Sequence, residues 1–246
     1  MLDPSALPRF SDLTLILTDR CNLSCRFCYV PRHAPRTMPA ELALRAVDLL
    51  LERAPAESQP SVSFFGGEPF LEPGLMARVM AHGAKRRPDL RFGAPTNGTL
   101  VDDRALELVQ RHRLDLALSV DAGTEGHTID RIAGRIDPLR GAVSIARMTV
   151  TPRNVDRLFE GIVELFGRGL ERIMHQPALE APWPAAAVAS WRDQHRRLAD
   201  WACERYAARQ PLPELVVLEG IIGRLERQTP PGFCGAGSTQ LAVDPD

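Results

Sequence analysis

The strongest constraint on the fold is a regular alternation of short β-prone runs with helical patterns along almost the whole chain. The β-prone runs cover residues 12–18, 61–65, 90–95, 114–121, 142–150 and 170–176. Helical patterns follow at residues 38–54, 73–87, 102–112, 155–167, 184–209 and 213–228, with Asp102 and Asn154 as expected N-caps. Six β-then-α units predict an α/β fold with a parallel sheet and covering helices.

The unusual polar residues of this chain lie at or just after the ends of the β-prone runs. This is where β/α barrels build their sites, so the sequence favours a partial (β/α)6 TIM-like barrel over residues 1–228. A doubly wound sheet is also compatible with the alternation. Residues 229–246 are expected to form a short C-terminal stub outside the barrel.

Composition excludes several classes of partner. The 30 Lys and Arg residues are balanced by 31 Asp and Glu residues, which leaves a net charge of −1 and predicts no nucleic-acid or membrane surface. There is no apolar stretch of about 18 residues and no signal peptide, so we expect a cytoplasmic protein.

Three of the five cysteines lie close together directly after the first β-prone run. Cys21, Cys25 and Cys28 supply three thiolates, which suit an iron–sulfur cluster or zinc. A closed zinc site needs a fourth ligand, and His33 is the nearest candidate. Cys203, on an amphipathic helical pattern, is expected to be a small core residue.

The C-x3-C-x2-C spacing, with the aromatic Phe27 before the last cysteine, resembles that of the radical S-adenosylmethionine (radical SAM) enzymes. The resemblance implies that Cys21, Cys25 and Cys28 hold a [4Fe-4S] cluster whose fourth iron is chelated by the methionyl group of S-adenosylmethionine. It also implies reductive cleavage of S-adenosylmethionine to a 5′-deoxyadenosyl radical, which removes a hydrogen atom from a substrate. An external one-electron reductant is then required.

The second β-prone run ends in Gly66, Gly67, Glu68 and Pro69. Two glycines permit a close approach of the backbone to a ligand, and Glu68 can accept hydrogen bonds from an ammonium group. The segment is similar to the GGEP motif of the family, which implies that it holds the methionyl amine.

Polar side chains at the next strand ends are further candidates for contacts with the cofactor. Thr96 and Asn97 end the third run, and Ser119 and Asp121, which share a face, end the fourth. Arg147 lies within the fifth, apolar run and needs an anionic partner, which the carboxylate of S-adenosylmethionine would provide.

Three residues around the sixth β-prone run are expected to point toward the substrate side of the barrel: His175, Gln176 and Glu180. Their types alone do not assign a catalytic role to any of them.

Cys234 and the glycines after it resemble the opening of a SPASM or twitch extension, as in sulfatase-maturase-like enzymes that modify peptides and proteins. The resemblance implies that 229–246 is the truncated start of such an extension and that the substrate is a peptide or protein side chain. Two alternatives stay open: a radical enzyme acting on a small molecule or nucleotide, and a non-catalytic metal-binding or electron-transfer module.

Overall fold

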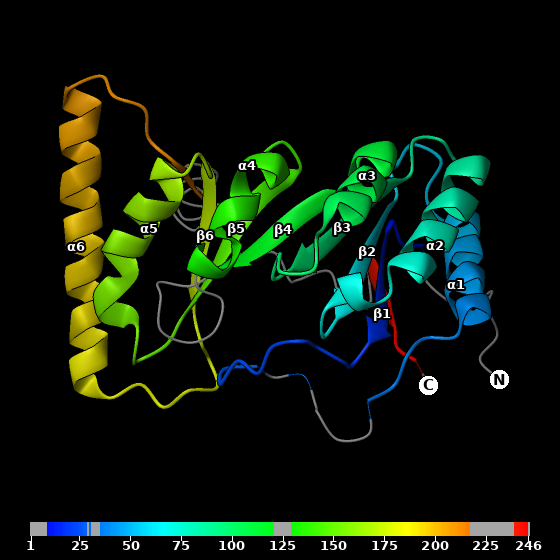
Figure 1. The fold of residues 1–246 in the computed structure, drawn as a ribbon, viewed down its shortest axis with the longest axis horizontal. Coiled ribbons are helices and arrows are strands. Elements are labelled where there is room, and N and C mark those ends of the chain that lie inside the picture. Colours follow the sequence, from blue (N-terminus) through cyan, green and yellow to red (C-terminus); the bar gives the residue numbers. More distant parts are fainter. Residues whose placement is uncertain (1–8, 29, 31–34, 121–128, 217–238, 246) are drawn as a thin grey trace.

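The computed structural model describes residues 9–28, 30, 35–120, 129–216 and 239–245. Within them, eight strands form one parallel sheet in the order β7-β6-β5-β4-β3-β2-β1-β8. The strands are β1 (Asp12–Thr18), β2 (Ser61–Gly66), β3 (Arg91–Thr96), β4 (Asp115–Val120), β5 (Val143–Val150), β6 (Arg172–Pro177), β7 (Glu214–Leu215) and β8 (Gln240–Val243). The α-helices are α1 (Ala40–Arg53), α2 (Pro73–Arg86), α3 (Asp103–His112), α4 (Ile136–Leu139), α5 (Leu158–Gly167) and α6 (Ala185–Ala207) (Figure 1).

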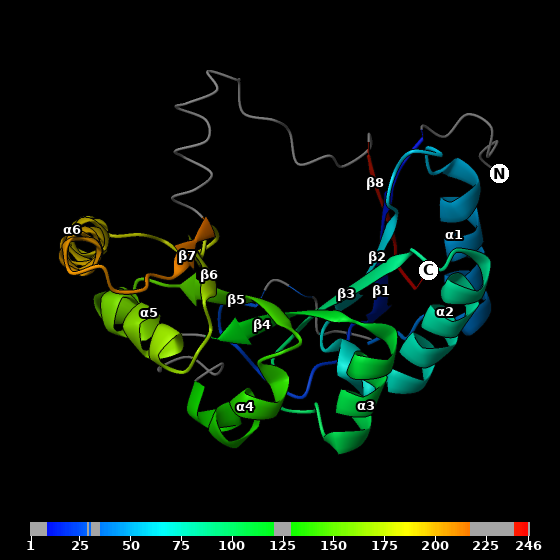
Figure 2. The same cartoon turned by 90° about the horizontal axis from the view of Figure 1, so that it is seen from above.

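The sheet curves into an arc, and the helices lie along its outer side (Figure 2). The first six strands follow one another in chain order, so the strand order never reverses in this part of the sheet. A doubly wound sheet requires such a reversal, which places helices on both faces. The structure therefore confirms the partial, open barrel and excludes the doubly wound alternative.

Strands β1 to β6 bury alternate residues against the helices. In β1, Leu13, Leu15 and Leu17 are at most 1% exposed, while Thr14 and Ile16 on the other face are only partly buried. Strand alternation explains this pattern, because the convex face packs on helices and the concave face lines a hollow. The concave face is thus free to build a site.

The structure differs from the sequence prediction at the C-terminal end. Within 213–228 we expected a helix, but β7 occupies Glu214–Leu215 and pairs with β6. Residues 240–243, which the sequence analysis placed in the stub, form β8 and pair in parallel with β1. Cys234 and the rest of the segment 217–238 lie outside the described residues, and the division into two domains stays a prediction.

The two expected helix caps have different outcomes. Asp102 caps α3, since its side chain accepts a hydrogen bond from the backbone N–H of Ala105 at 2.9 Å. Asn154 does not cap the following helix. Its Oδ1 accepts from the backbone N–H of Thr151 at 2.6 Å, and its Nδ2 donates to the carbonyl of Thr149, so it closes the turn after β5 instead.

Cys203 is exposed on α6, which contradicts the expected core position. The buried residues of α6 are Ala187, Gln194 and Leu198, and Cys203 falls outside the helical stripe that they define. No helix among the described residues is both long and apolar enough to cross a membrane.

Candidate active site

The carboxyl ends of the strands surround a cavity of about 870 Å³, which is large enough for a sizeable organic ligand. Most of the residues that the sequence analysis singled out line it. These are Cys21, Cys25, Phe27, Cys28, Gly66, Gly67, Glu68, Thr96, Asn97, Ser119, Arg147, Gln176 and Glu180. Pro69 is buried beside the cavity without lining it, and Asp121 lies outside the described residues.

The loop that carries the three cysteines is closed at its base. The guanidinium of Arg36 donates to the Asp19 carboxylate at 2.9 Å, and the Asp19 backbone N–H donates to the Arg36 carbonyl at 3.0 Å. Farther along the loop, the backbone N–H of Cys28 donates to the Cys25 carbonyl at 3.2 Å, which makes a tight turn between two of the thiols. The chain therefore leaves β1 and returns to it, holding the thiols over the cavity.

The two glycines of the Gly66–Pro69 segment pack against the beginning of the cysteine loop. A Cβ atom on Gly66 would lie 2.2 Å from the Thr18 carbonyl oxygen, and one on Gly67 would lie 2.0 Å from that of Arg20. Gly66 also has a φ of +129°, which favours glycine. We expected these glycines to approach a ligand; in the structure their close approach is to the chain's own backbone.

The Glu68 side chain is almost fully buried and connects β2 to β3. Its Oε1 accepts hydrogen bonds from the Thr96 hydroxyl at 2.8 Å and from the Phe70 backbone N–H at 3.1 Å. Its Oε2 accepts from the Asn97 backbone N–H at 2.8 Å. Burial raises the pKa of Glu68 above its ordinary value, and the hydrogen bonds from Asn97, Thr96 and Phe70 oppose that shift.

Asn97 connects the end of β3 to the cysteine loop. Its Nδ2 donates to Asn22 Oδ1 at 3.0 Å and lies 3.9 Å from the sulfur of Cys21. Its Oδ1 accepts from the backbone N–H of Thr99 at 3.0 Å and from the Thr99 hydroxyl at 2.6 Å. The hydroxyl of Thr99 in turn accepts from Asn22 Nδ2 at 2.8 Å, so the three side chains form a closed network.

Ser119 and Arg147 lie side by side on the other half of the cavity. They are paired residues of β4 and β5, and both line the cavity, as the strand alternation predicts for Arg147. Among the described residues, the guanidinium of Arg147 has no ion-pair partner. A cation without a partner in a cavity favours an anionic ligand.

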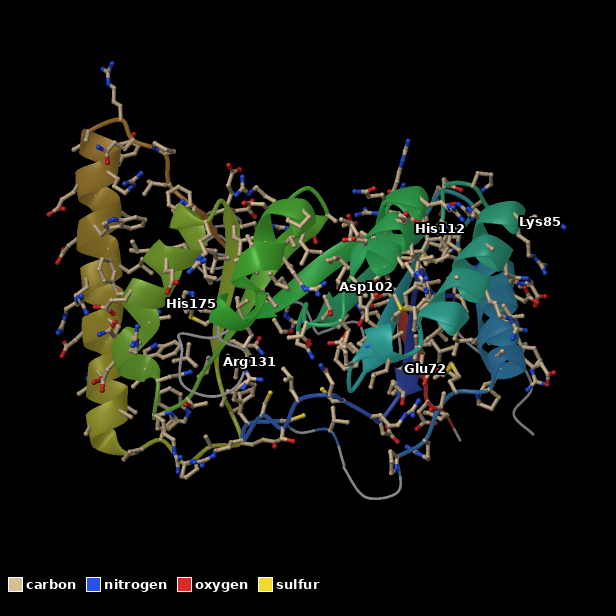
Figure 3. The ribbon with its side chains drawn as sticks, in the orientation of Figure 1. Glu72, Lys85, Asp102, His112, Arg131 and His175 are labelled. Carbon is tan, nitrogen blue, oxygen red and sulfur yellow. The ribbon has the colours of Figure 1, made fainter. Side chains whose placement is uncertain are left out.

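Two of the three residues expected on the substrate side lie on opposite faces of β6, and Glu180 lies in the loop after that strand. Gln176 and Glu180 line the cavity, but His175 points outward to α6 (Figure 3). There its Nε2 lies 3.0 Å from His195 Nε2, and its ring packs beside Trp191. Burial and the neighbouring His195 lower the pKa of His175 to about 4. The expectation for His175 is therefore wrong, because it shares its face of the strand with buried Ile173.

Several residues that line the cavity were not singled out from the sequence. Arg26 lies within the cysteine loop, Thr149 lies on the same face of β5 as Arg147, and Arg153 follows that strand. The alternation of β5 was the available signal for Thr149. For the two loop arginines, sequence periodicity carries no such signal.

The donor set of the cavity contains three thiols, which suit an iron–sulfur cluster. None of the four cysteines that the structure describes forms a disulfide, and three of them line the same cavity. Among the described residues, no three His, Cys, Asp or Glu side chains lie close enough to hold a single metal ion. His33, the fourth ligand of the zinc alternative, lies outside the described residues.

Comparisons with known proteins agree with this site. A family model described as the radical SAM superfamily matches residues 15–173. GTP 3′,8-cyclase 2 of Mycobacterium tuberculosis is 32% identical in an alignment 212 residues long that covers 82% of this chain and 57% of the relative. PqqA peptide cyclase of Gluconobacter oxydans is 37% identical over 127 residues, which are 51% of this chain and 33% of the relative. The chain thus spans about half or less of the length of these relatives.

Among solved structures, anSMEcpe with bound AdoMet and the Cp18Cys peptide superposes with a TM-score of 0.76. The alignment covers 97% of this chain and 72% of that chain at 17% identity. At such low identity, the likeness shows a shared fold.

Proposed function

The chain belongs to the radical SAM superfamily, and from that premise we propose that it is an enzyme that removes a hydrogen atom from a peptide or protein side chain. The superfamily uses a [4Fe-4S] cluster and S-adenosylmethionine. The single observation that carries the proposal is the convergence of three thiols, the Gly66–Glu68 segment and the ends of β3, β4 and β5 on one cavity.

In this proposal Cys21, Cys25 and Cys28 are the cluster ligands. When bound, the cluster and S-adenosylmethionine supply a one-electron reductive cleavage that yields a 5′-deoxyadenosyl radical. The electron comes from an external reductant, and a cytoplasmic location belongs to the same proposal.

A second group of cavity residues binds and orients S-adenosylmethionine. Arg147, which has no ion-pair partner in the described part of the chain, pairs with the methionyl carboxylate, and Ser119 beside it hydrogen-bonds the ribose. Phe27 and the Gly66–Glu68 segment line the side that holds the methionyl group. Because the Glu68 carboxylate already accepts three internal hydrogen bonds, it acts mainly by positioning β3 and the segment around it.

A peptide substrate is supported by the cavity's rim and by the relatives. Pro177 and Leu179 line both the cavity and a neighbouring apolar hollow of about 250 Å³, whose other walls are Trp183, Val188 and Trp191. Leu179 is 87% exposed. An apolar rim of this kind suits the side chains that flank the reacting residue of a peptide. PqqA peptide cyclase is among the relatives, and Cys234 is the observation that favours the SPASM or twitch branch with a second domain from residue 229.

A nucleotide is the second candidate substrate. Arg26, Arg147 and Arg153 all line the cavity, and clustered guanidinium groups suit phosphate. The relative that covers the larger share of this chain is a GTP 3′,8-cyclase.

The proposal is tested by anaerobic reconstitution with iron and sulfide, reduction with dithionite, and measurement of 5′-deoxyadenosine by liquid chromatography. We expect 5′-deoxyadenosine formation that requires Cys21, Cys25 and Cys28. Stoichiometric zinc without cleavage of S-adenosylmethionine would instead support the non-catalytic metal-binding module and overturn the enzyme proposal.

Two probes then separate the substrate classes. The first is a pool of short synthetic peptides whose central residue varies between apolar neighbours, and the second is GTP. Faster 5′-deoxyadenosine formation and a product lighter by two hydrogens with the peptide pool support the first candidate. Stimulation by GTP alone, with a cyclised nucleotide product, supports the second and overturns the first.

A further inference from the structure

We propose that Asn97 is a positioning residue whose side-chain amide holds the Cys21 arm of the cysteine loop and donates a hydrogen bond to the Cys21 sulfur, thereby raising the reduction potential of the cluster. This inference rests on the proposed function, because it concerns the cluster that the function requires. It assigns to Asn97 a role toward the cluster rather than the contact with S-adenosylmethionine that the sequence suggested.

The orientation of the Asn97 amide is fixed by a backbone group. The N–H of Thr99 can only donate, and it lies 3.0 Å from Asn97 Oδ1. The oxygen must therefore face Thr99, which leaves the NH2 group directed toward the cysteine loop.

The NH2 group has two hydrogens and two acceptors in front of it. One acceptor is Asn22 Oδ1 at 3.0 Å, and the other is Cys21 Sγ at 3.9 Å. The backbone N–H of Leu23 also approaches Cys21 Sγ, at 3.4 Å, so this sulfur has two hydrogen-bond donors.

The rest of Asn97 is held rigidly, so the amide is placed before any ligand binds. The residue is only 6% exposed, and its backbone N–H donates to Glu68 Oε2 at 2.8 Å. A chain of contacts therefore runs from the buried Glu68 through Asn97 to Asn22 and Cys21.

Hydrogen bonds to the sulfur ligands of an iron–sulfur cluster stabilise its more negative, reduced state and so raise its reduction potential. Removal of the donor is thus expected to make the cluster harder to reduce. Loss of a purely structural contact would lower the cluster content or the stability of the protein, but it would not lower the reduction potential of the cluster.

Three variants of the reconstituted protein separate the two contacts of the amide. Asn97→Ala removes both contacts. Asn97→Asp keeps the oxygen that accepts from Thr99, and the Asn22 amide can turn to donate to the new carboxylate. This variant therefore loses only the donor to the Cys21 sulfur. Asn22→Ala is the matched control, because it removes the tether and leaves the donor to Cys21. The readout is the midpoint potential of the cluster, followed by electron paramagnetic resonance during a redox titration.

We expect the midpoint to move to more negative values in Asn97→Ala and further in Asn97→Asp, where a negative charge is added. Asn22→Ala should shift it less than either. An unchanged midpoint in Asn97→Ala, or an equal shift in Asn22→Ala, would overturn the inference while leaving the proposed function intact. Absence of a [4Fe-4S] cluster from the unmodified protein would instead count against the proposed function.

A second measurement covers the case in which the Asn97 variants bind no cluster. The chain contains only three asparagines, Asn22, Asn97 and Asn154, so a side-chain 15N label on asparagine is nearly site-specific. In Asn22→Ala, electron–nuclear double resonance of the reduced cluster should detect one weakly coupled 15N. Its absence would contradict the direct contact between the Asn97 amide and the sulfur.

Discussion

The cavity has two walls that differ in how their polar groups are satisfied. The loop wall consists of the cysteine loop and the ends of β2 and β3, and its polar side chains are linked to one another by internal hydrogen bonds. The open wall consists of the ends of β4, β5 and β6, where Ser119, Arg147 and Gln176 line the cavity. The loop wall is therefore built in advance, whereas the open wall presents groups to ligands.

This contrast predicts that substitutions in the loop wall change stability and cluster content, and that substitutions in the open wall change ligand binding. Equal effects of loop-wall and open-wall substitutions on stability and on ligand binding would contradict this contrast.

The largest effect is expected for Glu68→Ala. It leaves the Thr96 hydroxyl and the backbone N–H groups of Phe70 and Asn97 without their acceptor in a buried place, which costs about 4 kcal/mol of unfolding free energy. Glu68→Gln, which turns one acceptor into a donor, should lose roughly half of that. Chemical denaturation followed by circular dichroism measures both.

The matched control on the open wall is Gln176→Ala, because Gln176 is exposed and lines the same cavity. It should change the unfolding free energy by less than about 0.5 kcal/mol. Equal losses for Glu68→Ala and Gln176→Ala would remove the distinction between the walls.

A somewhat smaller loss is expected for Gly67→Ala. The added Cβ would lie 2.0 Å from the carbonyl oxygen of Arg20, so the cysteine loop must move away from β2. We expect a loss of about 3 kcal/mol and a lower iron content after reconstitution.

Gly74→Ala is its control, since nothing lies within 4 Å of the added Cβ and the residue is in α2. That change should be neutral or stabilising by up to about 1 kcal/mol. If Gly67→Ala melts as the unmodified protein does, the close packing of the loop on β2 is not needed.

The packing of β6 against α6, behind the open wall, is expected to lose stability at acid pH. The imidazole of His175 takes up its proton near pH 4 in the folded protein but near pH 6.5, roughly, in the unfolded chain. Between these values the unfolded state binds more protons, so the unfolding free energy falls as the pH drops, by about 2 kcal/mol from pH 7 to pH 5. Denaturant titrations at the two pH values measure it.

His175→Phe should remove that part of the pH dependence. Apart from His195, which touches His175, the other histidines keep their surroundings in both proteins, so their contributions cancel in the comparison. An unchanged difference between pH 7 and pH 5 in the variant would mean that another group causes it.

The smallest effect in free energy is expected on the open wall itself. Arg147→Gln should weaken the binding of S-adenosylmethionine to the reconstituted protein about tenfold, which is about 1.4 kcal/mol, with little change in stability. Isothermal titration calorimetry under anaerobic conditions measures the Kd. Arg91→Gln, at the opposite end of β3, should leave the Kd unchanged, and an equal loss there would argue for a non-specific charge effect.

Sequence reasoning predicted what depends on local pattern. The β1 bounds, the Asp102 cap and the partial barrel follow from hydrophobic alternation and capping chemistry, and the structure has all three. The cysteine spacing and the Gly66–Pro69 segment identified the place of the site, because such combinations of residue types are rare without a ligand.

Features that depend on contacts between distant segments could not be predicted from the sequence. The pairing of β8 with β1, and the packing of Gly66 and Gly67 on the loop backbone, involve residues far apart in the chain. His175 was misplaced although its alternation with Ile173 carried the signal. Because His175 lies near the polar end of β6, we expected it in the cavity. The alternation of side chains along the strand instead places it on the face that packs against the helices.

The central claim is that Cys21, Cys25 and Cys28 hold one [4Fe-4S] cluster at the cavity, and iron and sulfide analysis of the anaerobically reconstituted protein tests it most directly. We predict about four irons per chain in the unmodified protein and in Cys203→Ala, whose thiol lies exposed on α6. Cys21→Ala, Cys25→Ala and Cys28→Ala should each lose the cluster. Four irons retained in any of these three variants, or a loss in Cys203→Ala equal to theirs, would contradict the account.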